Sequence, residues 1–374
     1  MNFKISKEFI FVFVISICIV VLFFIPNGFE GAKVKRGVPS KAKVEKVDNS
    51  LVRRIGVINT GEQRVFLTIL NGTYKNEKVE TNNQFLGKLE FDRLYKDNDI
   101  VFVVIDENEN HEIVYTNIID YYRLGSEILL FIIFALFLIL FSRWIGVKAI
   151  ISFMFTAVVI WKILLPAVLK GIDPVVISFI ITMIITSVII LLIGGFTKKG
   201  LTAIIGAVSG VLLTLILSLV FGKMFTISGS IKPFSETLLY SGFGHLNLSN
   251  IFLSGIFIAS SGAIMDIAMD IAASMNEVVE KKRDISRKEL VLSGFVVGRA
   301  VVGTMTTTLL LAYSGGYSTL LLIFMAQGTP MLNILNLQYV AAEILNTIVG
   351  SFGLVAVAPL TAIAGGFVYK YRSK

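Results

Sequence analysis

The chain has 374 residues, of which 55% are hydrophobic and 16% are charged, and its mean hydropathy is +0.79. This composition excludes an ordinary soluble domain, which would carry more charge and fewer long apolar runs. A net charge of +8 would suggest a nucleic-acid partner in a soluble protein. In an apolar chain it is explained by Lys and Arg residues that hold loops on the cytoplasmic side of a membrane. We therefore expect a lipid bilayer as the surroundings and no nucleic-acid partner.

The N-terminal residues predict a membrane anchor. Two lysines precede an apolar run over residues 9–25. A cleaved signal peptide needs small residues just before its cleavage point, but Glu30 lies two residues before the candidate at Ala32. We therefore expect an uncleaved transmembrane anchor over residues 1–27, with its N-terminus in the cytoplasm.

Residues 34–117 differ from the rest of the chain and predict a small extracytoplasmic β domain. Short β-type runs alternate with turn-like clusters such as Asn71-Gly72, a pattern typical of a small antiparallel sheet or a five-stranded barrel. An OB-like barrel is one form that fits, although no organised set of aromatic and basic residues indicates oligonucleotide binding. The predicted strands are Ser40–Val47, Arg53–Asn59, Gln63–Leu70, Gln84–Phe91 and Ile100–Ile105.

Residues 124–369 predict a membrane bundle of about seven helical spans, which with the anchor gives a polytopic α-helical membrane protein. Each clear apolar run approaches the roughly 20 residues that a helix needs to cross a bilayer. The runs cover about 124–141, 147–165, 174–195, 201–221, 250–275, 289–313, 317–332 and 339–369.

Basic residues between these runs predict the orientation of the helices. By the positive-inside rule the basic loops face the cytoplasm, and so does the basic C-terminus that ends at Lys374. This requires an even number of spans, whereas the runs and the anchor number nine. The sequence Gln327–Pro330 would break a helix, so we expect a broken or re-entrant segment near 317–335. The basic loop residues are Arg143, Lys148, Lys198, Lys199, Lys281, Lys282, Arg283, Arg287 and Lys288.

Two carboxylates stand out inside the predicted span over 250–275. Asp266 and Asp270 are four residues apart and therefore share one face of a helix. Ser274 and Glu277 continue that face towards the next loop. A carboxylate in the middle of a bilayer costs at least ~2.5–3.5 kcal/mol, so two of them on one face need compensation.

Arg299 on the next helix is the candidate partner for these carboxylates. It directly follows a GxxxG spacing, which allows close helix contact. Counting along both arms of a hairpin near residue 283 places Arg299 level with Asp270. We therefore expect Asp266, Asp270 and Arg299 to converge in a protein-lined region that binds a proton or a cation. Two simpler readings stay open: the cluster only pins two helices together, or the aspartates are hydrated near the cytoplasmic interface.

Weaker candidates lie in the last quarter of the chain. Glu343 and Asn346 are three residues apart and share a helical face, although an interfacial amphipathic turn explains them equally well. The single cysteine, Cys18, excludes an internal disulfide and a Cys-based metal site. No Walker P-loop, HExxH or GxSxG motif is present. We expect no enzymatic activity, no cofactor and no metal.

Several of these segments, in this order, resemble the YibE/F family of bacterial membrane proteins over nearly the whole chain. The resemblance implies a multi-pass protein of the bacterial plasma membrane and implies no activity. It rests on the N-terminal span with its β segment, Asp120-Tyr121-Tyr122-Arg123, the helix from Gly262 to Asp270 with Glu277, Gly298-Arg299, and Glu343–Gly353.

The intramembrane carboxylates favour a secondary transporter or ion-coupled permease, with a small solute, a proton or a cation as its cargo. The alternative is a non-transport membrane module, an assembly partner or a sensor, that uses the β domain for binding. Either protein could work as a homo-oligomer or a hetero-oligomer.

Overall fold

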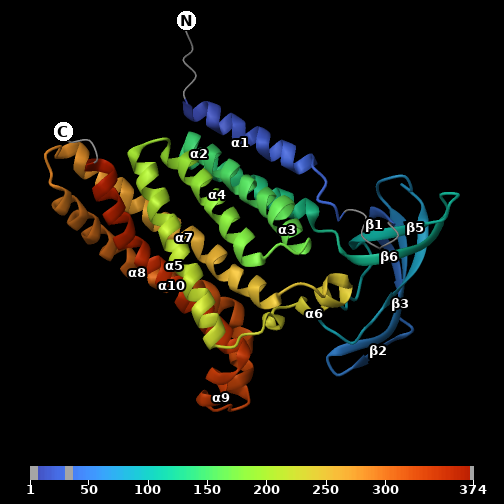
Figure 1. The fold of residues 1–374 in the computed structure, drawn as a ribbon. Coiled ribbons are helices and arrows are strands. Elements are labelled where there is room, and N and C mark those ends of the chain that lie inside the picture. The colour runs from blue at the N-terminus through green and yellow to red at the C-terminus, as the bar shows by residue number, and fades with distance from the viewer. Residues whose placement is uncertain (1–6, 30–36, 371–374) are drawn as a thin grey trace, which may run out of the picture. The chain divides into compact units, whose positions relative to one another are not determined.

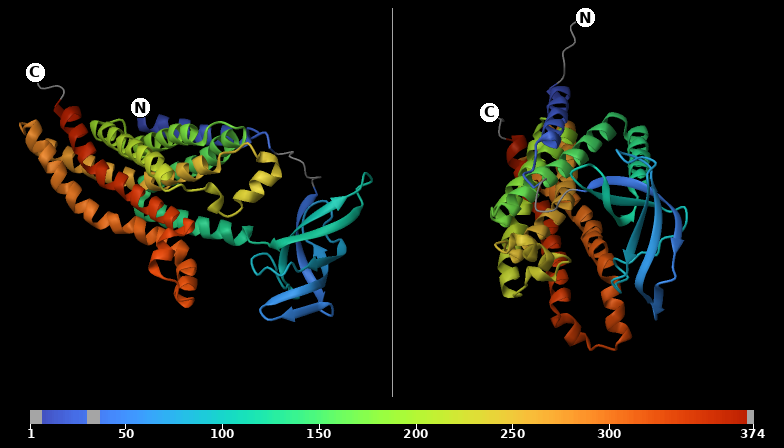
Figure 2. Two further views of the ribbon diagram at one scale, coloured as in Figure 1. Left: turned by 60° about the horizontal axis from the view of Figure 1, so that its bottom comes forward. Right: turned by 90° about the vertical axis from the view of Figure 1, so that its right-hand side faces the viewer.

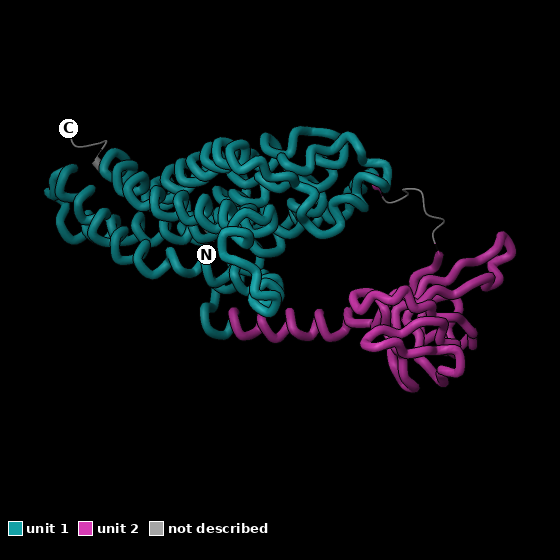
Figure 3. Tube along the Cα trace, turned by 90° about the horizontal axis from the view of Figure 1, so that it is seen from below, with its two compact units in different colours: residues 1–28, 139–374 teal, residues 29–138 magenta. Residues whose placement is uncertain are grey.

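The computed structural model describes residues 7–29 and 37–370. The first residues of the predicted anchor and the last basic residues, up to Lys374, lie outside these ranges. The chain forms two compact units, residues 29–138 and residues 1–28 together with 139–374 (Figure 3).

The smaller unit contains a curled antiparallel β half-barrel. The sheet follows the order β2-β3-β1-β5-β6, and β4 pairs with β3 over Glu62–Thr68. Its two edges approach each other where the Thr81 hydroxyl donates to the Thr116 carbonyl. The strands are β1 (Val38–Asp48), β2 (Val52–Ile55), β3 (Ile58–Ile69), β4 (Lys78–Gln84), β5 (Ile100–Glu107) and β6 (Ile113–Tyr121).

Alternating side chains build the core of this half-barrel. Every second residue of β5 points inward, and Val101, Val103 and Ile105 are completely buried, as the two-residue period of a strand requires. Three predictions need correction. The expected single strand over Arg53–Asn59 is divided, because β2 ends at Ile55, Gly56 turns the chain with φ +60°, and β3 begins at Ile58. The expected strand over Gln84–Phe91 is not formed, because β4 ends at Gln84 and Gly87 turns the chain with φ +73°. The last strand, β6, was not predicted and carries the sheet beyond residue 117.

The larger unit is a bundle of long apolar helices (Figure 1). Seven helical stretches in the described part of the chain are long and apolar enough to cross a membrane. The first part of α2, up to Leu138, belongs to the smaller unit. The helical elements of the chain are α1 (Lys7–Phe24), α2 (Leu124–Val159) with η1 (Ile160–Leu164) and α3 (Leu165–Leu169), α4 (Pro174–Gly194), α5 (Lys198–Met224), η2 (Gly229–Ile231), α6 (Ser235–Leu238), η3 (Leu239–Phe243), α7 (Leu248–Lys281), α8 (Arg287–Ala326), α9 (Met331–Asn336) and α10 (Gln338–Lys370).

The stretch from α2 to α3 is two helices joined at Arg143. It has 46 residues, or about 69 Å of helix, which is more than twice the apolar thickness of a bilayer. Arg143 interrupts it with φ 50° and ψ −124°. This break lies between the two apolar runs that the sequence predicts there.

The helix α8 is longer than the sequence predicts. It runs through residues 313–317 without interruption, so the apolar run over 317–332 is the end of α8 and not a separate span. The chain breaks at Gln327–Pro330, where Gly328 has φ +63°, and the short helix α9 follows. In both views of Figure 2, α8 and α10 run beside each other before α9.

Contacts at the helix termini define two ends of the bundle. At the first, which we call the basic end, Lys148 Nζ lies 3.0 Å from Glu8 Oε2, and Lys198 Nζ donates to the Tyr369 carbonyl at 3.3 Å. The opposite one, the loop end, holds residues 225–247 and α9. There Lys162 Nζ donates to the Ile25 carbonyl at 3.0 Å. Since α1 contributes to both ends, it is an integral helix of the bundle.

Candidate functional site

Asp266 and Asp270 lie on the outer face of α7. The opposite face of this helix, including Ile267 and Ile271, is completely buried, whereas both aspartates are exposed. Neither carboxylate makes an ion pair or a side-chain hydrogen bond with any residue that the structure describes. Ser274, half-buried, and Glu277, exposed, continue the face towards the basic end, as expected. These residues share a face but do not enclose a site.

Arg299 lies at the predicted depth but does not meet the aspartates. A Cβ added at the preceding residue, Gly298, would lie 3.3 Å from Ile271 Cδ1, so α8 and α7 are in register there. The Arg299 side chain instead lines a hollow between α8 and α10, beside Val355 and Pro359. The predicted convergence is therefore not found within one chain. Equal depth follows from counting along a hairpin, but the direction of a side chain depends on helix rotation.

Glu343 and Asn346 belong to a more organised polar cluster at the loop end. The Glu343 side chain is only 12% exposed, and its Oε2 lies 3.9 Å from Lys232 Nζ. Asn346 Nδ2 donates to Glu343 Oε1 at 3.3 Å, and Lys232 Nζ donates to the Tyr317 hydroxyl at 3.0 Å. We call Lys232, Tyr317, Glu343 and Asn346 the Lys232 cluster. It joins α8 and α10 to the segment between α5 and α7.

An aromatic side chain holds Lys232 over the start of α7. Lys232 Nζ lies 5.3 Å from the centre of the Phe252 ring, within the range of a cation–π contact. The Tyr317 hydroxyl, the Phe252 ring and the Glu343 carboxylate thus surround the Lys232 ammonium. Lys232 is 40% exposed, so water also reaches this end of the cluster.

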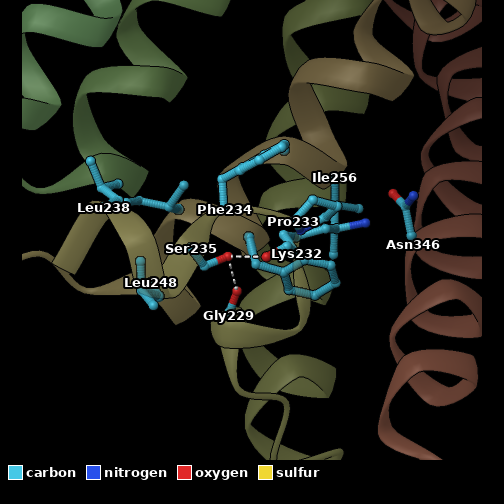
Figure 4. A pocket seen from close by; sticks show the side chains of 12 residues that line it. Gly229, Lys232, Pro233, Phe234, Ser235, Leu238, Leu248, Ile256 and Asn346 are labelled. Carbon is cyan, nitrogen blue, oxygen red and sulfur yellow. Dashed lines mark hydrogen bonds between the residues drawn. The ribbon is translucent and has the colours of Figure 1, made fainter. Parts of the chain in front are cut away.

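Two hollows meet at the Lys232 cluster. The first has a volume of about 510 Å³, and in Figure 4 Lys232 and Asn346 extend into it from the loop and from α10. The second, of about 340 Å³, lies between α8 and α10 and is lined by Tyr317 and Glu343. The Lys232–Glu343 pair therefore stands between the two hollows. Other residues lining the first hollow are Gly229, Pro233, Phe234, Leu248 and Ile256.

Two buried oxygens near this pair lack hydrogen-bond donors or acceptors among the described residues. They are Glu343 Oε2 and the Tyr313 hydroxyl. A buried carboxylate is unfavourable unless it is paired or protonated, and Lys232 approaches Oε2 without a hydrogen bond. Glu343 Oε2 is therefore a buried acceptor without a hydrogen-bond donor among the described residues. Within residues 7–29 and 37–370, no group of three or more His, Cys, Asp or Glu side chains could hold a metal ion.

The two sets of carboxylates lie at different depths. Gly350 of α10 packs against Ser260 of α7, because a Cβ added at Gly350 would lie 3.4 Å from Ser260 Cβ. Counting along both helices from this contact places Asp266 about 20 Å further towards the basic end than Glu343. The predicted site residues therefore form two separate groups and not one site.

Comparison with family models decides where the chain belongs. The model described as YibE/F-like protein matches residues 130–371, and that of the YibE/F family N-terminal domain matches residues 39–121. The chain belongs to the YibE/F family. The sequence-based resemblance is thereby confirmed. The N-terminal match ends with β6 at residue 121, and the other begins at residue 130, within α2. No curated protein and no solved structure matches the chain.

Sequence reasoning missed three residues of this YibE/F protein that the structure places around Glu343. They are Lys232, Tyr313 and Tyr317. Lys232 lies in a polar loop, where a lysine normally contacts only water, and the tyrosines lie in an apolar run, where they resemble packing residues. A helical face is visible in a sequence, but this contact joins residues far apart in the chain.

Proposed function

We propose that this YibE/F protein crosses the membrane eight times. The seven long helical stretches give eight crossings when the break at Arg143 divides the stretch over 124–169. Both termini then lie on one side. The basic end carries most of the loop lysines and arginines, which favours the cytoplasm for that end and the outside for the β domain.

Thiol labelling tests this orientation. A cysteine at the exposed Asn82 of β4, in a Cys18→Ala background, should react with a membrane-impermeant reagent in intact cells. One placed at the exposed Asp284 of the basic end should react only after lysis. The opposite pattern would reverse the orientation.

We further propose that the protein is a secondary transporter coupled to a proton or a monovalent cation. The observation that carries this proposal is the nearly buried Glu343, with one unbonded oxygen 3.9 Å from Lys232. Ionisable side chains are rare within membrane helices and are commonly part of a transport pathway. Broken helical backbone at the edge of the membrane often lines such a pathway, and residues 225–247 contain only the short elements η2, α6 and η3 joined by turns.

The Lys232 cluster suggests how coupling works. The ionised Glu343 carboxylate attracts the Lys232 ammonium and so holds the segment 225–247 against α10. When Glu343 takes up a proton, that attraction is lost and the segment is free to separate from α10. Protonation would thereby open the space between the two hollows to the loop end, which supplies one of the two states that alternating access requires.

Flux through proteoliposomes tests the proposal. We expect the wild-type protein to pass protons or a monovalent cation down an imposed gradient. Glu343→Gln should lower this flux at least tenfold, because it removes the titrating group at almost constant volume. Glu277→Gln, an exposed carboxylate on α7, is the matched control and should leave the flux unchanged. Absence of flux in the wild type under every gradient, or equal flux in Glu343→Gln, would contradict the proposal.

One observation supports the alternative, a membrane module that binds an external ligand. The β domain has a hollow of about 510 Å³ beside β4 and β6, lined by Tyr74, Glu80 and His111 among others. Tyr74 donates to the Glu107 carboxylate and to the His111 carbonyl, which fixes one wall. The approach of β4 to β6 also fits a partly open, OB-like barrel. A sensor of this kind would show no flux. Tyr74→Phe, which removes the hydroxyl that fixes this wall, would weaken its binding of the external ligand.

A further inference from the structure

We propose that copies of this chain assemble side by side in the membrane through an Asp270–Arg299 contact between neighbouring copies. The outer face of α7 on one copy would dock into the groove between α8 and α10 on the next. The two surfaces adjoin the hollows at the Lys232 cluster, because Leu310 lines both the groove and the second hollow and Gly255 lines the first. The contact uses none of the four residues of the cluster, and the inference does not depend on the transport proposal.

The groove is a mostly apolar surface depression that runs along α8 and α10. Two hollows, of about 330 Å³ and 410 Å³, share Val355 and follow one another between α8 and α10. The groove is lined by Phe295, Val302, Leu310 and Phe352, together with several threonines. Among the described residues that line these two hollows, Arg299 alone carries a charge. An arginine in an otherwise apolar groove favours an occupant that is apolar and carries a carboxylate at one depth.

The outer face of α7 has that chemistry. Small residues precede its carboxylates, because Gly255, Ala259 and Gly262 are exposed at helical spacing before Asp266 and Asp270. A Cβ added at either glycine would meet no atom within 4 Å. Small residues allow another membrane helix to approach closely, and the exposed aspartates supply the negative charge. The two surfaces are therefore complementary in both shape and charge.

Depth is the observation that selects a second copy as the occupant. Gly298 and Ile271 are in register within one chain, so Arg299 and Asp270, their direct neighbours, lie at the same depth. Copies inserted in one membrane share their orientation, so Arg299 of one copy is automatically level with Asp270 of the next. An unrelated partner would match this depth only by coincidence.

A lipid headgroup is a poorer counter-charge for Arg299. The residue lies twelve positions after Arg287, the first residue of α8, which is about 18 Å along the helix. Charged residues at such a depth normally face protein and pair with one another.

The contact joins two different surfaces, so it is head-to-tail and produces a ring when the rotation between copies closes.

Cross-linking between differently tagged copies tests the inference. In a Cys18→Ala background, one copy carries Asp270→Cys and the other Arg299→Cys, and membranes are treated with a short bismaleimide. We expect a cross-link that contains both tags. The matched control replaces Arg299→Cys with Ala300→Cys, which lies on the same turn but outside the groove, and should give at least fivefold less product. Equal yields, or a cross-link of Asp270→Cys with itself, would overturn the assignment.

Two measurements keep the inference testable if the cysteine variants are unstable. Native mass measurement of the wild-type protein in mild detergent should show a discrete oligomer, and a monomer or a complex with a different protein would contradict the inference. Asp270→Arg and Arg299→Asp should each reduce the oligomer, whereas the double exchange should restore it.

Discussion

Replacing Gly353 with alanine tests the packing of α10 against α5 and α7. A Cβ added at Gly353 of α10 would overlap Thr214 Oγ1 of α5 and would lie 3.0 Å from Ile264 Cδ1 of α7. Thr214 and Ile264 are both completely buried, and Thr214 Oγ1 donates to the Gly210 carbonyl at 3.0 Å. Neither neighbour can move aside, so Gly353→Ala must push α10 away from α5 and α7.

The expected loss of stability follows from two opposing effects. Forcing an extra methyl into a well-packed core costs about 1–3 kcal/mol. The cost for Gly353→Ala should lie at the upper end of this range, because the added Cβ overlaps a short side chain that a hydrogen bond holds in place. The better helix propensity of alanine offsets about 1 kcal/mol of this cost. We therefore expect Gly353→Ala to lower the free energy of unfolding by about 2 kcal/mol, measured by denaturing-detergent titration of the purified protein.

Two matched variants separate overlap from a general effect of alanine. A Cβ added at Gly315 of α8 would meet no atom within 4 Å, so Gly315→Ala should be neutral or slightly stabilising. Adding Thr214→Ala to Gly353→Ala removes the overlapping oxygen and should recover at least half of the loss. The reasoning would be refuted if Gly353→Ala unfolded at the same detergent fraction as Gly315→Ala, or if Thr214→Ala gave no recovery.

Two further predictions concern charge pairs. Glu8→Gln leaves the buried Lys148 ammonium without its partner and should destabilise the bundle by about 1–2 kcal/mol in the same titration. This is less than the loss for a fully buried pair, because Glu8 is half exposed. Adding Lys148→Met to Glu8→Gln should recover stability, and no recovery would argue against the pair. The hydrogen bond from Arg123 lowers the pKa of Asp120 below its usual 3.8, so its contribution is present above that pH and is lost as the pH falls through the lowered pKa. Asp120→Asn should therefore lower the protection of β6 against hydrogen exchange at pH 7 by about 1 kcal/mol, and a difference that persists at the acid end would contradict this assignment.

Local features of this chain were predictable from sequence, because they depend on spacing along one element. Apolar runs located the long helices, and Gln327–Pro330 marked the break after α8. The three-residue spacing of Glu343 and Asn346 placed them on one face, where they form a hydrogen bond. The four-residue spacing of Asp266 and Asp270 predicted that they share one face of α7, but it did not reveal that this is the outer face.

Features that depend on long-range contacts were not predictable. Helix rotation turns Arg299 into the groove beside α10, and no spacing within α8 reveals that rotation. Lys232 reaches Glu343 only because the segment between α5 and α7 folds back towards α10. Most side chains of the strand β4 are exposed or half-exposed, and the strand therefore carries few apolar residues. The alternation of apolar and polar residues that identified β5 was absent from it.

The most direct test of the Lys232 cluster is whether Glu343 exchanges a proton. Infrared difference spectra of the purified protein, recorded between acidic and neutral buffer, report protonated carboxyl groups through their C=O stretch. We expect a protonated-carboxyl band that Glu343→Gln removes and that Lys232→Met alters, since the ammonium lies 3.9 Å from the carboxylate. An identical spectrum for the wild-type protein and Glu343→Gln would show that Glu343 does not titrate, and would contradict its role in coupling.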